Sequence, residues 1–284
     1  MPLSWHHLTL DLPPHWEVIA YRKDPRNGEI ALADRAGETL RAFWRVMDTR
    51  PTVTGPLIDL VAAQEGITLD KAEIRRRIVD LKDDWVAFLP RERDLPCFAA
   101  YYHPPEQVLL NFTFPPHPDT ADRDVVRAII ESWTPNDGDE RRWAAFGLDV
   151  TLPKEMRLDG VSALPAAQIL GFENKRDETV TVHRYGMMPL ALGGEDMTAF
   201  FARIKGRGTR LVRTGAFRKD DRYDGVILEY ATRGKGGLDS LLARIWLGRV
   251  WIWMCDDLKR LYIVDHHAPE KNHIAGFPDR VRPR

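Results

Sequence analysis

The sequence predicts an α+β protein made of two tandem copies of one domain, each an antiparallel sheet flanked by helices. Three segments recur at an offset of 140 residues: 10–13 (LDLP) as 150–153 (VTLP), 38–40 (ETL) as 178–180 (ETV), and the apolar run 57–66 as 197–206. A self-similarity this long indicates whole domains, because solenoid repeats span about 20–50 residues. Expected strands come in runs with a helix in the middle and a helix at the end, which favours antiparallel pairing.

The length and composition fit this organisation. The 284 residues, 44% hydrophobic and 29% charged, leave room for two soluble domains of about 100–150 residues each. The stretch 134–140 (TPNDGDE) is polar and rich in turn-forming residues, and it lies between Trp133 and Trp143. We therefore expect a first repeat over residues 1–134 and a second over residues 141–284.

The first half should contain seven strands. Leu8, Leu10 and Leu12 alternate with polar residues, which is typical of a half-buried strand. The residues 34–37 (DRAG) have the composition of a hairpin turn. The strands are expected at residues 7–12, 16–21, 28–34, 38–47, 85–89, 98–103 and 108–114.

Three helices are expected in the same half. Pro56 stands where a first helical residue is expected, just ahead of a helix over 57–64, and Gly66 follows the end of that helix. A second helix is predicted over 70–81. The closing helix, over 119–133, has one apolar stripe formed by Val125, Ile129, Ile130 and Trp133.

The second half repeats this order and then departs from it. Its strands are expected at 146–152, 167–172, 179–185, 211–217, 225–230, 245–255 and 260–266, with a helix at 195–205. Only fifteen residues follow Pro269, and Gly276, Pro278 and Pro283 are among them. We therefore expect no counterpart of the closing helix, so that domain one or a partner would cover one sheet face of domain two.

Charge and cysteine usage exclude several classes of function. The 41 Lys and Arg balance 42 Asp and Glu, giving a formal net charge of −1. This balance disfavours binding to nucleic acid or to an anionic membrane. No apolar run approaches the roughly 18–20 residues of a membrane span. Cys97 and Cys255 form no disulfide framework, so we expect a cytoplasmic protein.

The opening of the chain carries a resemblance to a known family. Residues 10–16 (LDLPPHW) form a strand followed by the motif LP-x-x-W. This motif, followed by a hairpin, a helix, a strand meander and a terminal helix, resembles the Mog1/PsbP-like group. The second half opens with residues 151–156 (TLPKEM), where Met156 replaces the Trp, and it lacks the final helix.

The resemblance implies a fold and a class of function. Members of that group mostly bind: a small GTPase, a photosystem, or hydrophobic segments of secreted effectors. It therefore implies a non-catalytic soluble binding or adaptor module. None of the group's binding motifs is recognisable in this sequence, so no site residue is carried over from it.

One motif suggests an alternative function. Asp265-His266-His267 follows an apolar strand and is similar to the DHH motif of metal-dependent phosphoesterases. A metal-dependent hydrolase would use Asp265, His266 and His273. That family also needs an upstream Asp-rich motif on another strand, and residues 136–139 (NDGD) lie in a linker. Because His266 and His267 point to opposite faces of a strand, at most one can join His273. We expect no catalytic residue, no metal and no cofactor.

The tryptophans and the basic loops point to partners. Trp246, Trp251 and Trp253 share one strand region, where Trp251 and Trp253 lie on one face. If this strand is buried on both sides, the tryptophans belong to the core. If domain two lacks its closing helix, one face is an apolar platform for a protein partner or for self-association. The basic loop 205–210 (KGRGTR) and Arg75-Arg76-Arg77 could form a patch for an anionic partner.

Overall fold

The computed structural model describes residues 2–205, 209–220, 222–233, 245–268 and 277–283. The chain divides into two compact units, residues 1–138 and 139–284. The division falls inside the polar stretch 134–140.

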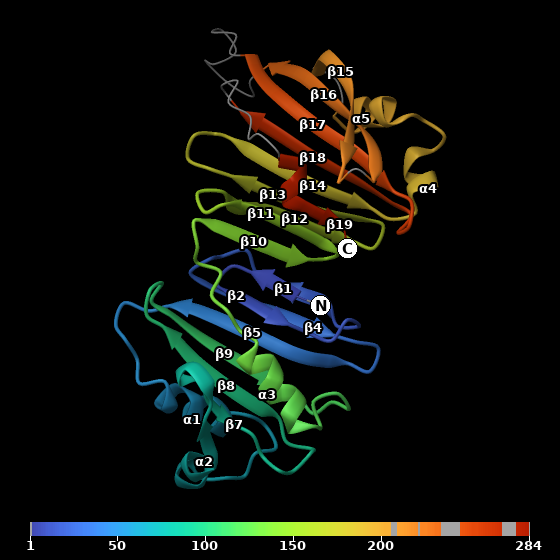
Figure 1. Cartoon of the computed structure of the whole chain (residues 1–284). Helices are drawn as coiled ribbons and strands as arrows, with labels where there is room; N and C mark the ends of the chain where they lie inside the picture. Colours follow the sequence, from blue (N-terminus) through green and yellow to red (C-terminus); the bar gives the residue numbers. More distant parts are fainter. Residues whose placement is uncertain (1, 206–208, 221, 234–244, 269–276, 284) are drawn as a thin grey trace. The chain divides into compact units, whose positions relative to one another are not determined.

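Unit 1 consists of a short hairpin and a seven-stranded antiparallel sheet (Figure 1). The hairpin pairs β1 (Pro2–Trp5) with β2 (Leu8–Asp11). The sheet has the order β3-β4-β5-β9-β8-β7-β6. Its strands are β3 (Glu17–Tyr21), β4 (Asn27–Ala33), β5 (Glu38–Val46), β6 (Ile78–Asp80), β7 (Val86–Phe88), β8 (Cys97–His103) and β9 (Val108–Phe114).

The helices of unit 1 cover both faces of its sheet. On one face, α1 (Thr54–Ala62) and α2 (Lys71–Arg77) contribute Leu57, Ile58, Val61 and Ile74 to a core with Phe88, Phe98 and Ala100. On the other face, α3 (Arg123–Glu131) leads into Trp133, whose ring lies 4.8 Å from that of Tyr101. Tyr101 and Ala100 are neighbours in β8, so their side chains point to opposite faces.

Unit 2 contains a second hairpin and a second seven-stranded sheet. The hairpin strands β10 (Glu140–Ala145) and β11 (Leu148–Pro153) are joined by β19 (Val281–Pro283), which pairs with β11. The sheet order is β12-β13-β14-β18-β17-β16-β15. Its strands are β12 (Arg157–Leu164), β13 (Ala167–Glu173), β14 (Thr179–Tyr185), β15 (Thr209–Lys219), β16 (Tyr223–Arg233), β17 (Ile245–Cys255) and β18 (Arg260–Ala268).

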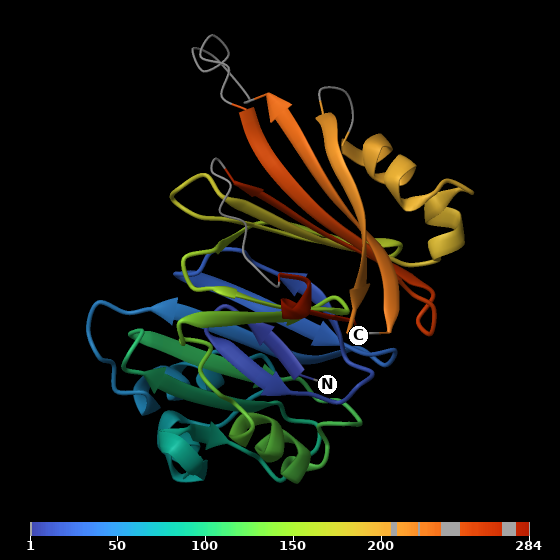
Figure 2. The ribbon, with the colours of Figure 1, turned by 45° about the horizontal axis from the view of Figure 1, so that its top comes forward.

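Two helices lie along one face of the second sheet (Figure 2). These are α4 (Met188–Leu192) and α5 (Met197–Lys205). Phe200 and Phe201 of α5 enter a core with Leu228, Tyr230, Val250, Ile252, Leu261 and Ile263. No helix among the residues that the structure describes is long and apolar enough to cross a membrane.

The two large sheets have the same topology. In each, three strands are followed by two helices and then by four strands. The strand that begins the final four lies at one edge of the sheet, and the first strand lies at the other edge. The strands of each sheet are joined by antiparallel pairing throughout. The final strand of each set, β9 or β18, pairs with the third strand.

Several predicted elements differ from the structure. The helix predicted over 70–81 ends at Arg77, and Ile78–Asp80 form the edge strand β6 because they pair with β7. The helix predicted over 119–133 begins at Arg123, because the Asp122 side chain caps it by accepting the Asp124 N–H. The strand predicted over 146–152 is the second strand of a hairpin whose first strand, β10, the sequence did not indicate.

Other elements were not predicted at all: β1, β12, α4 and β19. After Ala268 the described residues form a 3₁₀ turn (Phe277–Arg280) and β19. The prediction that no closing helix occurs there falls largely on residues 269–276, outside the described residues.

Candidate functional site

The tryptophans predicted to contact a partner lie in β17. Trp251 and Trp253 are 5% and 0% exposed, on the face of the sheet opposite the α5 core. The Trp253 ring stacks on Tyr262 at 5.5 Å and meets Phe217 edge-on at 6.2 Å. Trp246 belongs to the same strand, but its side chain lies outside the described residues. The two described tryptophans are thus packed side chains, and their role in partner binding stays a prediction.

The C-terminal residues of the alternative metal site do not converge. Asp265 and His266 are neighbours in β18 and point to opposite faces. The buried His266 ring nitrogen Nε2 lies 2.6 Å from Glu178 Oε1. His267, on the Asp265 face, lies 3.1 Å from Thr232 Oγ1. His273 lies outside the described residues. Asp265 and His266 therefore cannot bind one ion together in this arrangement.

Asp265 instead belongs to a buried polar cluster under α5. The Tyr230 hydroxyl donates to Asp265 Oδ1 at 2.6 Å, and Lys205 Nζ forms an ion pair with Oδ2. Lys205 Nζ also lies 5.0 Å from the centre of the Tyr230 ring. Burial and the Asp265 charge raise the pKa of Tyr230, which keeps its hydroxyl a donor. Both carboxylate oxygens of Asp265 are therefore occupied within the fold.

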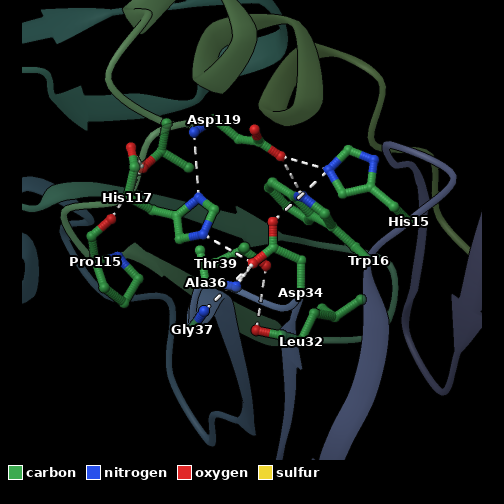
Figure 3. Close-up of polar contacts among 11 residues, drawn as sticks. His15, Trp16, Leu32, Asp34, Ala36, Gly37, Thr39, Pro115, His117 and Asp119 are labelled. Atoms are coloured by element: carbon green, nitrogen blue, oxygen red, sulfur yellow. Dashed lines mark hydrogen bonds and ion pairs between the residues drawn. The ribbon is translucent and has the colours of Figure 1, made fainter.

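A second polar cluster lies in unit 1, where three separate segments meet (Figure 3). His15 comes from the loop between β2 and β3, Asp34 from the turn between β4 and β5, and Asp119 from the segment between β9 and α3. One ligand atom from each of these residues lies within 4.8 Å of the other two. No pattern in the sequence connects these three residues.

Asp34 is held by the turn that it begins. Its Oδ1 accepts the backbone N–H groups of Ala36 at 2.6 Å and Gly37 at 3.3 Å. The same oxygen lies 2.9 Å from His117 Nε2. Burial opposes ionisation of Asp34, but these hydrogen bonds and the His117 side chain outweigh it and lower the pKa of Asp34. Asp34 is therefore a carboxylate at neutral pH, and its Oδ2 faces His15 Nε2 at 3.8 Å.

Asp119 is held by the tryptophan of the LP-x-x-W motif. The Trp16 indole N–H donates to Asp119 Oδ2 at 2.9 Å, and His15 Nε2 lies 2.6 Å from the same oxygen. These two contacts lower the pKa of Asp119. Trp16 itself is fully buried, whereas the His15 side chain is 55% exposed. The motif thus anchors Asp119 from inside the fold while His15 reaches it from the solvent side.

His117 supports both carboxylates. Its Nδ1 accepts the backbone N–H of Asp119 at 3.2 Å, so the proton of the neutral ring must lie on Nε2. That N–H donates to Asp34 Oδ1. The His117 side chain is 3% exposed. It is therefore a fixed internal support, distinct from the exposed His15.

The cluster borders an open surface groove. This groove has a volume of about 580 Å³ and is lined by His15, Glu17, Ile19, Ala33, Asp34 and Arg35. An imidazole nitrogen and two carboxylate oxygens are ligand types that divalent transition metals accept. Among the described residues, this is the one group of three or more histidine, cysteine and acidic side chains close enough to share an ion.

The matching turn of unit 2 has different chemistry. Asn174 lies 140 positions after Asp34. Its Oδ1 accepts the backbone N–H of Arg176, two residues later, at 2.8 Å. Asp34 accepts the backbone N–H of Ala36 in the same way. Glu155 lies 140 positions after His15. A groove of about 660 Å³ is lined there by basic residues as well as by Asn174 and Glu155. The basic residues of this lining are Lys154, Arg157, Lys175 and Arg176.

The second sheet ends in a long exposed strand. β15 is eleven residues long and, among the described residues, pairs with β16 alone. The pairing shifts by one residue between Leu211 and Arg213, which leaves Val212 as a bulge. Leu211 and Val212 are 43% and 61% exposed. Arg210 and Arg213 are also exposed, and neither forms an ion pair with any described residue.

Comparisons with known proteins assign no family. No family model matches the sequence, and no curated protein matches it. One similar solved structure is the solution structure of cyanobacterial PsbP (CyanoP) from Synechocystis sp. PCC 6803. The two chains are 15% identical, and the match covers 51% of this chain and 93% of that one, with a TM-score of 0.36. A similarity at this score does not establish the fold family.

Proposed function

We propose that this protein is a non-catalytic binding or adaptor module built from two copies of one PsbP-like α+β fold. The LP-x-x-W motif, the offset of 140 residues and the common order of strands support the two-copy interpretation. Within the module, unit 2 binds an extended acidic segment of a protein partner along β15. The open, basic edge of β15 is the observation that carries this proposal.

An exposed edge strand offers unpaired backbone groups for strand addition. Partners that bind in this way gain affinity from main-chain hydrogen bonds and specificity from alternate side chains. Proteins usually protect such edges by keeping them short or by placing lysine, proline or bulges in them. β15 has one bulge and one lysine, the buried Lys219, but it is eleven residues long and presents Leu211 and Val212 to solvent. An incoming strand would cover both side chains.

The charge on this edge selects the partner. Arg210 pairs opposite Ala231 and Arg213 opposite Glu229, so both arginines lie on one face despite the bulge. Glu229 is already paired with Arg249 on the neighbouring strand, at 2.6 Å. Of these four residues, the three arginines outnumber the single glutamate. A segment with acidic side chains at alternate positions would place them beside Arg210 and Arg213.

The same charges argue against pairing between two copies of β15. Two such strands side by side would bring their arginines close together, and like charges on facing strands are destabilising. A protein partner of opposite charge is favoured over self-association through this edge.

The reactive groups of the fold favour binding over catalysis. Cys97 is buried, and burial raises the pKa of its thiol to about 11, which disfavours the nucleophilic thiolate. Cys255 is also buried. Asp265 is occupied by Tyr230 and Lys205. The cytoplasmic location and the exclusion of nucleic acid remain predictions from cysteine usage and charge balance.

A synthetic strand peptide tests the proposal. The probe is a fluorescent heptapeptide in which glutamate alternates with valine, and its binding to the full chain is followed by anisotropy. We expect the wild-type protein to bind it, with affinity falling as salt is added. The double variant Arg210→Glu, Arg213→Glu should bind it about tenfold or more weakly, a change of about 1.4 kcal/mol.

The opposite edge of the same sheet supplies the control. Arg157→Glu reverses one exposed charge on edge strand β12 and should leave peptide binding unchanged. A peptide in which lysine replaces glutamate should not bind the wild-type protein. Equal binding of the glutamate peptide by the wild-type protein and the double variant, or no binding by the wild-type protein, would refute the proposal.

A further inference from the structure

The most specific chemistry outside β15 lies in unit 1, at the cluster of His15, Asp34 and Asp119. We infer that these three residues bind one divalent transition-metal ion, with Zn²⁺ as the reference ion. The metal site lies in unit 1 and the proposed docking strand lies in unit 2, so each proposal can be tested independently of the other. The ligand atoms lie close together, hydrogen bonds hold both carboxylates in place, and unit 2 offers an internal comparison.

The ligand atoms are close enough together for one ion. His15 Nε2 lies 2.6 Å from Asp119 Oδ2 and 3.8 Å from Asp34 Oδ2. Zinc binds nitrogen and oxygen at about 2.0–2.2 Å, which separates neighbouring tetrahedral ligands by about 3.3 Å. The two distances lie on either side of that value. Small side-chain movements would therefore admit the ion in place of the proton between His15 Nε2 and Asp119 Oδ2, and the neutral ring would then carry its proton on Nδ1.

The oxygen of Asp34 that faces His15 differs from the oxygen that holds the turn. Oδ1 accepts the N–H groups of Ala36 and Gly37 and that of His117. Oδ2 faces His15. The turn and the ion would thus use different oxygens of one carboxylate. Binding the ion would not require the turn to open.

Each carboxylate has a supporting donor of the kind found around metal sites. His117 donates to Asp34, and Trp16 donates to Asp119. His117 is itself fixed by the Asp119 backbone N–H. Outer-shell donors of this kind orient metal ligands and reduce metal affinity when they are removed. Both carboxylates are held in place before any ion arrives, so binding costs little side-chain ordering.

The corresponding turn of unit 2 forms without the proposed metal ligands of unit 1. Asn174 makes the corresponding side-chain contact to the backbone with a neutral amide. Glu155 stands where the offset places the counterpart of His15, and Lys154, Lys175 and Arg176 line the adjoining groove. The turn needs a side-chain oxygen acceptor, which either Asp or Asn provides. The carboxylate at position 34 is therefore available for a role beyond the turn.

The ligand types determine which ion fits. One imidazole and two carboxylates suit zinc or manganese, whereas Ca²⁺ takes 6–8 oxygen ligands. The two negative charges of Asp34 and Asp119 balance a divalent cation. Three protein ligands leave a fourth position toward the groove of about 580 Å³, where water or a ligand of a partner can bind.

Titration calorimetry of the full chain with ZnCl₂ tests the site. The wild-type protein should bind one equivalent at this site, and Ca²⁺ should not compete. Asp34→Asn keeps the acceptor that Asn174 uses and removes the charge, and His15→Gln removes the exposed imidazole. Each variant should bind Zn²⁺ at least about 100-fold more weakly, or not at all.

The matched control is Glu155→Gln, at the corresponding position of unit 2, which should bind Zn²⁺ as the wild-type protein does. Circular dichroism confirms that each variant is folded. The inference is overturned if the wild-type protein binds no Zn²⁺. It is also overturned if Asp34→Asn and His15→Gln both bind like the wild-type protein, because the ion would then be held elsewhere.

Discussion

The ring of Tyr230 packs directly against Gly248 on the neighbouring strand. A Cβ atom at position 248 would lie 2.0 Å from Tyr230 Cζ and 2.4 Å from its hydroxyl oxygen. The missing side chain lets the ring cross β17, so that the hydroxyl reaches Asp265 on β18. The ring also stacks on His267, with 6.0 Å between centroids. The polar cluster of Tyr230, Asp265 and Lys205 under α5 therefore requires a glycine at position 248.

Gly248→Ala should therefore destabilise the protein. The new methyl group must push the Tyr230 ring away from Asp265, and overpacking of this kind costs about 1–3 kcal/mol. Urea unfolding followed by fluorescence measures the change. Gly160→Ala is the control, because a Cβ there meets no atom within 4 Å, and it should leave stability unchanged or raise it by about 0.4–1 kcal/mol. Equal losses in the two variants would contradict the role of Gly248.

Tyr230→Phe separates the hydroxyl from the ring. The ring can still cover Gly248, but Asp265 loses one of its two partners while 5% exposed. Leaving a buried charge with a missing hydrogen bond costs about 1–3 kcal/mol. Chemical denaturation measures the loss. A variant as stable as the wild-type protein would show that Lys205 alone satisfies the carboxylate.

The sequence predicted elements well where hydrophobic periodicity was strong. Strand β17 has the predicted bounds, and Trp16 and Met156, the paired positions of the LP-x-x-W motif, are 0% and 2% exposed. The sequence did not predict a strand that lacks an alternating hydrophobic pattern and forms because a neighbouring strand pairs with it. β12 contains Asp159, Gly160 and Ser162, and it exists because β13 supplies a partner along its length.

The candidate metal site could not be predicted from spacing. His15 and Asp119 are 104 residues apart, and no local motif connects them. The turn signal at residues 34–37 was correct, but it indicated a hairpin and not a ligand. Asp119 was assigned to a helix, whereas it lies ahead of the Asp122 cap in the segment where His117 and Trp16 hold it. Only the folded arrangement of three segments reveals the cluster.

His183 should make stability depend on pH. Burial lowers the pKa of His183 to about 4, against 6.5 for an ordinary histidine. Between these values the unfolded chain binds a proton that the folded chain does not, so stability rises with pH across this range. It is lost as pH falls from about 6.5 to about 4, by about 3 kcal/mol in total.

His183→Gln should flatten the stability profile between these pH values. Thermal unfolding of the wild-type protein and the variant at several pH values gives the two slopes. His266, whose pKa burial also lowers, remains in both proteins, so its contribution cancels in the comparison. Identical slopes would mean that His183 is not buried in its neutral form.

Cys97 should be unreactive in the folded protein. Its side chain is fully buried, and with a thiol pKa of about 11 it has almost no thiolate at neutral pH. Iodoacetamide followed by peptide mass spectrometry should label Cys97 only after denaturation. Rapid labelling of the native protein would instead indicate a reactive thiol and would support a catalytic role for Cys97.

The last prediction concerns Asp34 in the absence of any ion. Its Oδ1 accepts two backbone N–H groups in the turn, and Asn174 shows that an amide oxygen can fill this role. Asp34→Asn should therefore retain most of the stability, whereas Asp34→Ala leaves those donors and His117 without their acceptor and should be clearly less stable. Thermal unfolding in the presence of a chelator compares the two variants without interference from bound metal. If Asn and Ala are equally destabilising, the charge of Asp34 holds the turn, and Asp34→Asn would no longer isolate the metal ligand from the fold.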